Sequence, residues 1–246
     1  MTARAVARVL AMAALLLICL PIWAICRLFG GGAFMVRFFL GSVGWLLGLR
    51  VQVEGQPIDG NVLYAGNHIS WLDIPAIGGA APARFIAKSE IAGWSIIGWL
   101  AKIGGSVFVA RQKRSETRQQ ANAVSVALTE GRPVVLFAEG GTGDGLVLTP
   151  FRPSLFAAAN EAGVTVQPLA VDYGARAGEI AWPSGAGFAS ELKRMLNRPA
   201  PVHVTLHFLP PLDGASVDRK SLARETYAAV AAALQLAEPE LADPTR

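Results

Sequence analysis

The sequence predicts an α/β fold, with a mixed, mostly parallel sheet covered by helices and preceded by a membrane-associated pair of helices. Apolar, strand-like runs alternate with helical stretches from about residue 50 onward, which is typical of such a sheet. Hydrophobic residues make up 52% of the 246-residue chain and charged residues only 16%, below the about 25% usual in soluble domains. This composition excludes disordered and collagen-like chains. We expect a membrane-anchoring helix pair over 1–49, an α/β domain over 50–237 and a flexible tail over 238–246.

The N-terminal segment is the membrane candidate. Between Arg8 and Arg27 lie 18 uncharged residues, near the lower limit for a spanning helix, and we expect Pro21 to interrupt them. A second apolar stretch, Phe38–Leu49, is too short to span alone, and the glycines at 30–32 predict a bend between the two. We therefore expect two helices joined by a turn, lying in or dipping into one leaflet. The alternative is a cleaved signal peptide, although no clear A-x-A cleavage site follows.

The charge distribution supports a membrane partner. No acidic residue precedes Glu54, whereas the same segment holds five arginines, which leaves 17 basic and 18 acidic residues for the rest of the chain. Unopposed arginines beside apolar residues suit an anionic membrane surface. The nearly balanced main domain argues against a nucleic-acid partner. Cys19 and Cys26 are the only cysteines, too few for a disulfide framework or a zinc site, which fits a reducing compartment.

The main domain is expected to contain seven strands and five helices. Runs rich in β-branched and aromatic residues predict the strands: Val51–Glu54, Val62–Ala65, Arg84–Ala87, Ser106–Val109, Val134–Phe137, Val164–Val171 and Val202–Leu209. Caps and helical periodicity predict the helices: Trp94–Lys102, Ser115–Glu130, Ser154–Ala162, Ser184–Leu196 and Ser216–Ala237.

A histidine and an aspartate follow the strand over 62–65. His68 is expected at the carboxyl end of that strand, where α/β sheets place their sites. Asp73 lies five residues further on, a spacing that lets its carboxylate fold back onto the imidazole. Such a pair makes a general base that could activate a substrate hydroxyl. The alternative is a helix cap at Asp73 and a hydrogen-bonded surface histidine.

Two other strands deliver polar or glycine-rich segments. One runs from Gly105 to Arg111, whose planar guanidinium suits phosphate or carboxylate. The other ends in Glu139, which begins a glycine-rich turn whose backbone N–H groups could meet an oxyanion. A plain loop is the alternative for this turn. The run over 166–171 is expected to be a buried strand, with Pro168 at a bulge or an edge.

Together these segments resemble the glycerolipid acyltransferase family, which includes the 1-acylglycerol-3-phosphate acyltransferases. The H-x-x-x-x-D motif matches at His68 and Asp73, and V-x-P-[VIL] matches at 166–169. The G-x-x-F-[IV]-x-R motif matches at Gly105, Phe108 and Arg111. The F-P-E-G-T-R motif is met in part, at Phe137, Glu139 and Gly140. The resemblance covers roughly 50–210.

The resemblance implies a role for each matched residue. His68 would be the general base and Asp73 its orienting partner, while the arginine and glutamate motifs would bind the acceptor. The substrate-binding candidates are then Gly105, Arg111, Glu139, Gly140, Gly141, Thr142 and Arg152. The donor would be an acyl carrier protein or coenzyme A thioester, and the basic residues from Arg111 to Arg118 could meet an acidic carrier. No metal or other cofactor is implied. The two apolar stretches and the five unopposed arginines predict a location at the cytoplasmic face of a bacterial inner membrane.

The glycine-rich turn departs from the family motif. Thr142 stands where the family has an arginine, and the run over 138–156 resembles the lyso-ornithine lipid acyltransferase branch. Two acidic residues and one missing cation favour an acceptor that carries an amine, such as lyso-ornithine lipid. A lysophosphatidate acceptor stays open, because Arg152 could replace the missing arginine.

Other classes of protein fit less well. A nucleotide site would need G-x-G-x-x-G or a P-loop lysine, and neither is present. A serine hydrolase would need G-x-S-x-G, which the segment over 93–98 misses by one position. His203 and His207 share one strand face but lie about 13 Å apart, too far to chelate one ion. A non-catalytic lipid-binding module would keep the pocket and the membrane anchor without needing His68.

Overall fold

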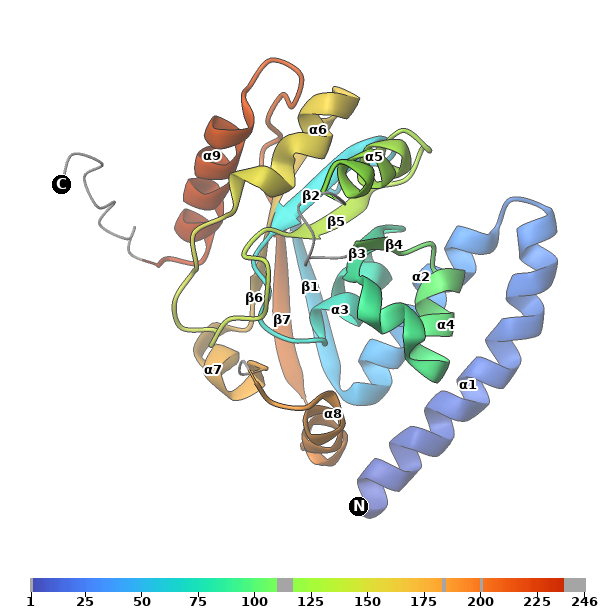
Figure 1. Cartoon of the computed structure of the whole chain (residues 1–246). Helices are drawn as coiled ribbons and strands as arrows, with labels where there is room; N and C mark the ends of the chain where they lie inside the picture. The colour runs from blue at the N-terminus through green and yellow to red at the C-terminus, as the bar shows by residue number, and fades with distance from the viewer. Residues whose placement is uncertain (1, 110–116, 183–184, 200, 237–246) are drawn as a thin grey trace.

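A computed structural model of the chain describes residues 2–109, 117–182, 185–199 and 201–236, with the side chains of 117–121 left aside. Its centre is a seven-stranded sheet (Figure 1), and each expected strand is present to within two residues at either end. The strands are β1 Leu49–Gly55, β2 Val62–Gly66, β3 Arg84–Lys88, β4 Val107–Val109, β5 Val134–Phe137, β6 Thr165–Asp172 and β7 Val202–Phe208.

The sheet is mixed and mostly parallel, as predicted. Its spatial order is β1-β7-β6-β2-β5-β3-β4. The pair β6–β7 is antiparallel, and the other five neighbouring pairs are parallel. The adjacent strands β6, β2 and β5 therefore run in one direction and end at the same edge, where parallel sheets place their sites.

Helices cover both faces of the sheet (Figure 1). The core on one face joins the sheet to α1 Ala3–Leu28, α2 Gly32–Leu47, α3 Asp73–Ala80 and α8 Phe188–Asn197. The core on the other face joins it to α5 Thr117–Leu128, α6 Ala157–Ala162 and α9 Arg219–Ala233. The remaining helices are α4 Ser95–Ile103, α7 Ala177–Ile180 and the 3₁₀ turns η1 Ser89–Gly93, η2 Pro153–Phe156 and η3 Gly174–Arg176.

Some helix boundaries differ from those expected. The last helix begins after Asp218, whose carboxylate accepts hydrogen bonds from the N–H groups of Lys220 and Ser221. This side-chain cap sets the start three residues after Ser216. Similarly, α8 begins at Phe188 rather than Ser184, which lies outside the described residues together with Ser115.

The N-terminal pair of helices is present, but the expected interruption at Pro21 is wrong. Helix α1 is continuous through Pro21, because a proline removes one intrahelical hydrogen bond while the many others of a long helix remain. An 18-residue window of this helix has a mean hydropathy of 2.7, so the helix is long and apolar enough to cross a membrane, whereas α2 is a shorter apolar helix. The bend at the glycines is confirmed, with φ +79° at Gly30.

A buried arginine fixes the beginning of α1 to the main domain. The Arg8 Nη1 donates to the carbonyl oxygens of Met195, Leu196 and Arg198, at 3.1, 2.9 and 2.8 Å. These carbonyls belong to the end of α8, where intrahelical donors run out and a cation is favoured. The apolar helix is thus docked on the domain at its N-terminal end and packs on α2 further along.

Candidate active site

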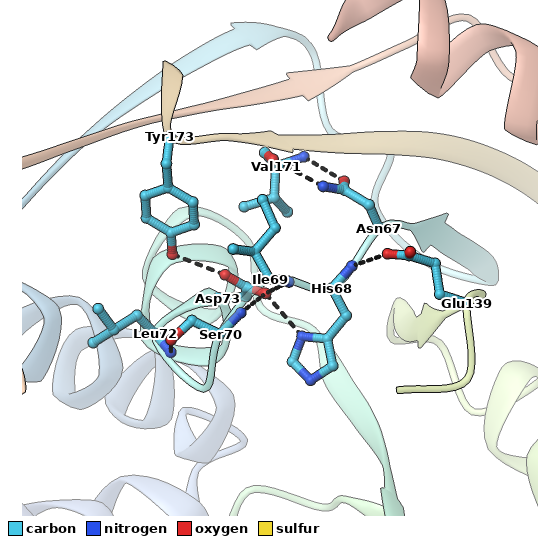
Figure 2. Close-up of polar contacts among 9 residues, drawn as sticks. All are labelled: Asn67, His68, Ile69, Ser70, Leu72, Asp73, Glu139, Val171 and Tyr173. Carbon is cyan, nitrogen blue, oxygen red and sulfur yellow. Dashed lines mark hydrogen bonds and ion pairs between the residues drawn. The ribbon is translucent and has the colours of Figure 1, made fainter. Parts of the chain in front are cut away.

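His68 lies at the edge where β6, β2 and β5 end (Figure 2). It follows the fully buried strand β2 by two residues. Its Nδ1 is 2.8 Å from Asp73 Oδ2, and 16% of its side chain is exposed. The ring stacks on Phe137 at the end of β5, with 3.7 Å between ring centroids and an interplanar angle of 11°. This packing and the bond to Asp73 hold the imidazole in one orientation.

Asp73 is wholly buried and engaged on both oxygens. It opens α3, and its Oδ2 accepts from the N–H groups of Ile69 and Ser70 at 2.8 and 3.0 Å. Its Oδ1 accepts from the Tyr173 hydroxyl at 2.8 Å (Figure 2). In the tautomer that carries a proton on Nδ1, the His68 ring donates a hydrogen bond to this carboxylate. The other ring nitrogen, Nε2, is left to accept a proton from substrate.

Tyr173 is a site residue that the sequence motifs do not contain. It immediately follows β6 and is 4% exposed. Its burial, and next the Asp73 carboxylate, raise the pKa of the phenol well above its usual value, so the phenol remains a donor. The available signal was a tyrosine directly after a buried strand, which becomes informative only when that strand is known to lie beside β2.

Asn67 is a second site residue that the sequence motifs do not contain. Its Nδ2 donates to the carbonyl of Val171 at 2.9 Å, and its Oδ1 accepts from the Val171 N–H at 2.8 Å (Figure 2). This two-bond clamp joins the chain leaving β2 to the end of β6. It therefore fixes the spacing between His68 and Tyr173, the two side chains that meet at Asp73.

Glu139 is buried beneath the glycine-rich turn. Its Oε1 accepts from the His68 N–H at 2.8 Å, and its Oε2 accepts from the Thr149 N–H at 2.9 Å. Burial raises the pKa of this carboxyl, and the two backbone donors oppose the rise. Glu139 was predicted to contact the acceptor; in the structure both oxygens accept from backbone N–H groups, and the residue also lines a cavity beside His68. Glu139 thus ties the turn to the catalytic segment.

The glycine-rich turn has one further contact with His68, and the other predicted binding residues lie in or against this turn. The Gly143 N–H donates to the His68 carbonyl at 2.9 Å. Gly140 has φ +84°, and a Cβ added there would lie 2.9 Å from Arg152 Nε, so the exposed Arg152 side chain covers this glycine. Gly141 and Thr142 are partly exposed in the same turn. The structure therefore places these predicted residues in or against one turn, which Glu139 and Gly143 join to His68.

Gly105, a predicted binding residue, is not brought to this site. Gly105 precedes β4, so it lies at the opposite edge of the sheet, against the side chains of Arg84 and Arg132. Its φ of +79° accounts for a glycine there. Arg111 lies outside the described residues, as do Lys113 and Arg114, and the side chain of Arg118 is not described.

A cavity of about 260 Å³ opens beside the pair of His68 and Asp73, between the glycine-rich turn, the end of β6 and the end of α9. Its lining includes His68, Glu139, Val147, Asp172 and Leu234. Within the described residues, no Lys or Arg lines it, and no group of three or more His, Cys, Asp or Glu side chains could hold a metal ion. His207 of β7, which was considered above as a metal ligand, contacts Glu54, with 3.0 Å between Nδ1 and Oε2.

Comparison with known proteins identifies the family. A family model described as Acyltransferase matches residues 50–172. The lyso-ornithine lipid O-acyltransferase of Pseudomonas aeruginosa is 34% identical over 81% of this chain and 78% of its own length. The chain belongs to the acyltransferase family. It is accordingly an acyltransferase enzyme, and the non-catalytic lipid-binding module is set aside.

Other acyltransferases show similar relationships. The lyso-ornithine lipid O-acyltransferase of Brucella abortus is 36% identical over 82% of each chain. The 1-acyl-sn-glycerol-3-phosphate acyltransferase of Neisseria gonorrhoeae is 39% identical over 52% of this chain and 50% of its own. The crystal structure of the acyltransferase PlsC from Thermotoga maritima shares the fold, with a TM-score of 0.67 and 22% identity over 93% of this chain and 96% of that one. Such relatives and the apolar α1 indicate membrane association.

Proposed function

We propose that this acyltransferase moves a fatty acyl group from an acyl carrier protein or coenzyme A thioester to the hydroxyl of lyso-ornithine lipid. The proposed place is the cytoplasmic face of a bacterial inner membrane. The observation that carries the proposal is the pair of His68 and Asp73, in which a buried carboxylate with four donors holds the imidazole beside a cavity. Residues 1–49 would be the anchor and 50–237 the catalytic domain.

The reaction follows from the orientation of the ring. With Nδ1–H held by Asp73, Nε2 takes the proton of the acceptor hydroxyl as its oxygen bonds to the thioester carbonyl carbon. The carbon–sulfur bond then breaks, and the proton on Nε2 passes to the departing thiolate. Asp73 stabilises the imidazolium that exists between these two steps. The chain contributes no covalent intermediate, because the acceptor hydroxyl is itself the nucleophile.

Two observations favour lyso-ornithine lipid over lysophosphatidate. The relatives named for lyso-ornithine lipid align over 73–82% of this chain, whereas the neisserial glycerophosphate enzymes align over 52%. The described cavity lining also contains Glu139 and Asp172 and no cationic side chain. A phosphate dianion wants cationic or N–H donors, while the amine of an ornithine headgroup is compatible with carboxylates.

Replacing the base tests the reaction. Because general-base catalysis contributes about 10²–10⁴ in rate, His68→Ala should lose most acyl transfer, and Asp73→Asn somewhat less. His203→Ala, an exposed histidine on β7, is the matched control and should retain activity. Turnover near that of the unmodified enzyme in a folded His68→Ala protein, verified by circular dichroism, would contradict the proposed chemistry.

A side-by-side assay tests the acceptor. Purified lyso-ornithine lipid and lysophosphatidate are offered with the same acyl donor, first as acyl carrier protein thioester and then as coenzyme A thioester. We expect a higher kcat/KM for the lyso-ornithine lipid. Efficient acylation of lysophosphatidate alone would overturn this assignment, and Arg152→Gln would then show whether Arg152 supplies the phosphate contact.

A further inference from the structure

Helix α4 presents an apolar surface to the outside of the catalytic domain. Of its nine residues only Gly98 is buried. Ile96 is 63% exposed, Trp99 43% and Ile97 38%, and Trp94 at the N-cap is 37% exposed. Isolated exposed apolar residues are ordinary, but neighbouring large side chains of this kind on one short helix mark an interaction surface.

This surface is continuous with that of the N-terminal helices. Gly104, which caps α4, lies against α2, because a Cβ added there would be 3.8 Å from Val36 Cγ1. Figure 1 shows α4 beside α2 and α1 on the same side of the molecule. The two N-terminal helices also expose large apolar side chains, among them Leu10, Leu17, Ile18, Ile25, Phe34, Phe38 and Trp45.

The charges on these helices suit an anionic bilayer. The sequences of α1, α2 and α4 contain no Asp or Glu. Their exposed cations are Arg4, Arg27, Arg37 and Lys102, and the one acidic residue on the neighbouring η1 is Glu90. Tryptophans beside basic residues are typical of the level where headgroups meet acyl chains, which favours a bilayer over an acidic carrier protein as the occupant.

A series of aromatic ring contacts links the start of α4 to the segment between His68 and Asp73. The ring of Trp94 lies 5.0 Å from that of Phe188, which lies 6.1 Å from that of Trp71. Trp71 belongs to the turn between His68 and Asp73. The apolar surface of α4 therefore adjoins the segment that carries the base.

We infer that α4 is a second membrane-contacting element, placed on the catalytic domain itself and separate in sequence from the N-terminal helices. Its residues Ile96 and Trp99 enter the boundary between headgroups and acyl chains. The edge of the domain next to the base is thereby held at the bilayer, so a lysolipid can reach His68 while its acyl chain stays in the lipid. The inference holds for any lysolipid acceptor.

The depth of a single label tests this inference without using activity. In the full chain with Cys19→Ser and Cys26→Ser, a cysteine is placed by Ile96→Cys, Leu17→Cys or Val126→Cys and labelled with a nitrobenzoxadiazole dye. Val126 is the matched control, since it is 59% exposed on α5, which packs on the opposite face of the sheet from α2. Each protein is reconstituted into phosphatidylethanolamine and phosphatidylglycerol vesicles.

We expect the label at position 96 to behave like the label at position 17. Both should be quenched by lipids brominated on the acyl chain and protected several-fold from aqueous iodide, whereas the label at 126 should show the reverse. A label at 96 that iodide reaches as easily as at 126 would overturn the inference. Protection from iodide without quenching by bromolipid would also overturn it, because a second copy or a carrier protein would then cover α4.

A variant gives an independent measurement. Ile96→Ser with Trp99→Ser should lower acylation of lysolipid embedded in vesicles several-fold, while acylation in detergent micelles and the unfolding midpoint stay unchanged. Val126→Ser should change none of these. An equal loss in vesicles and in micelles would show that α4 acts on the fold or the chemistry and not on membrane contact.

Discussion

Two buried carboxylates organise this site: Asp73 binds the His68 ring, and Glu139 binds the backbone on either side of the glycine-rich turn. Asp73 receives a ring nitrogen, two backbone N–H groups and a phenol, so its charge acts on the base. Glu139 accepts from the backbone N–H groups of His68 and Thr149 and from the Thr149 side chain, so its charge positions the chain that carries His68. A buried carboxylate without donors would be strongly destabilising, and each donor therefore contributes to both stability and geometry.

Removing the phenol that reaches Asp73 should affect catalysis more than binding. In Tyr173→Phe the buried Oδ1 of Asp73 loses its donor, and a hydrogen bond to a charged group is worth about 1.5–3 kcal/mol. We expect kcat to fall about tenfold, which corresponds to ~1.4 kcal/mol, with KM little changed. Steady-state kinetics measure kcat and KM, and urea unfolding in detergent measures the change in the free energy of unfolding.

The matched control is Tyr64→Phe. This buried tyrosine donates to the carbonyl of Ile58 instead of to Asp73. The substitution should lower the free energy of unfolding without a comparable loss of kcat. Equal losses of kcat in the two variants would show that Tyr173 acts only through stability.

Glu139→Gln should change how stability depends on pH. Burial raises the pKa of Glu139 in the folded state, so the folded protein binds this proton more tightly than the unfolded chain, in which glutamate has a pKa of about 4.3. The contribution of this group to stability is present below that value and is lost as pH rises through the higher folded pKa. The amide that replaces this carboxyl in the variant does not titrate.

The free energy of unfolding, measured in urea from about pH 4 to pH 8, should therefore fall with rising pH by more in the unmodified enzyme than in Glu139→Gln. The other titrating groups cancel in this difference. A difference between the two proteins that is constant over the pH range would contradict the assignment.

Helices α2 and α3 pack closely where Gly41 lies against Gly79. This contact helps to position Asp73, the first residue of α3. A Cβ added to Gly79 would lie 2.6 Å from the Gly41 Cα, a backbone atom that cannot move aside alone. Since α3 begins at Asp73, any separation of these helices displaces the carboxylate from His68. The helix that carries the Asp73 carboxylate is thus held by the second N-terminal helix.

Gly79→Ala should accordingly destabilise the fold by about 1–3 kcal/mol and lower kcat. Gly93→Ala is the control, since nothing lies within 4 Å of a Cβ added there, and it should be close to neutral. Thermal unfolding and acyl-transfer rates of the two variants provide the comparison. Equal stabilities would contradict the close approach of α2 and α3.

For the molecule as a whole, apolar contact should dominate over charge in membrane attachment. Salt screens exposed charges beyond about 10 Å at 0.1 M, but it does not weaken burial of apolar side chains in lipid. We expect most of the protein to stay in the membrane fraction after a high-salt wash and after a carbonate wash, as followed by immunoblot. Full release by either wash would contradict anchoring by α1 and its neighbours.

Local sequence features were sufficient to predict the strands and the contact between His68 and Asp73. Strand runs such as Val134–Phe137 are recognisable because their residue types suit a buried, pleated segment whatever their neighbours are. The spacing from His68 to Asp73 is also local, because the turn between them needs only the intervening residues. Helix ends were less certain where a cap such as Asp218 competes with an earlier serine.

Tertiary structure decided everything that depends on which strands are neighbours. The order β6-β2-β5 and the antiparallel β6–β7 pair depend on contacts between residues far apart in the chain, and no local pattern contains them. That order brings Tyr173 to Asp73 across 100 positions and Glu139 to His68 across 71. It also leaves Gly105 at the far edge, because parallel strands carry their beginnings and their ends to opposite sides of the sheet.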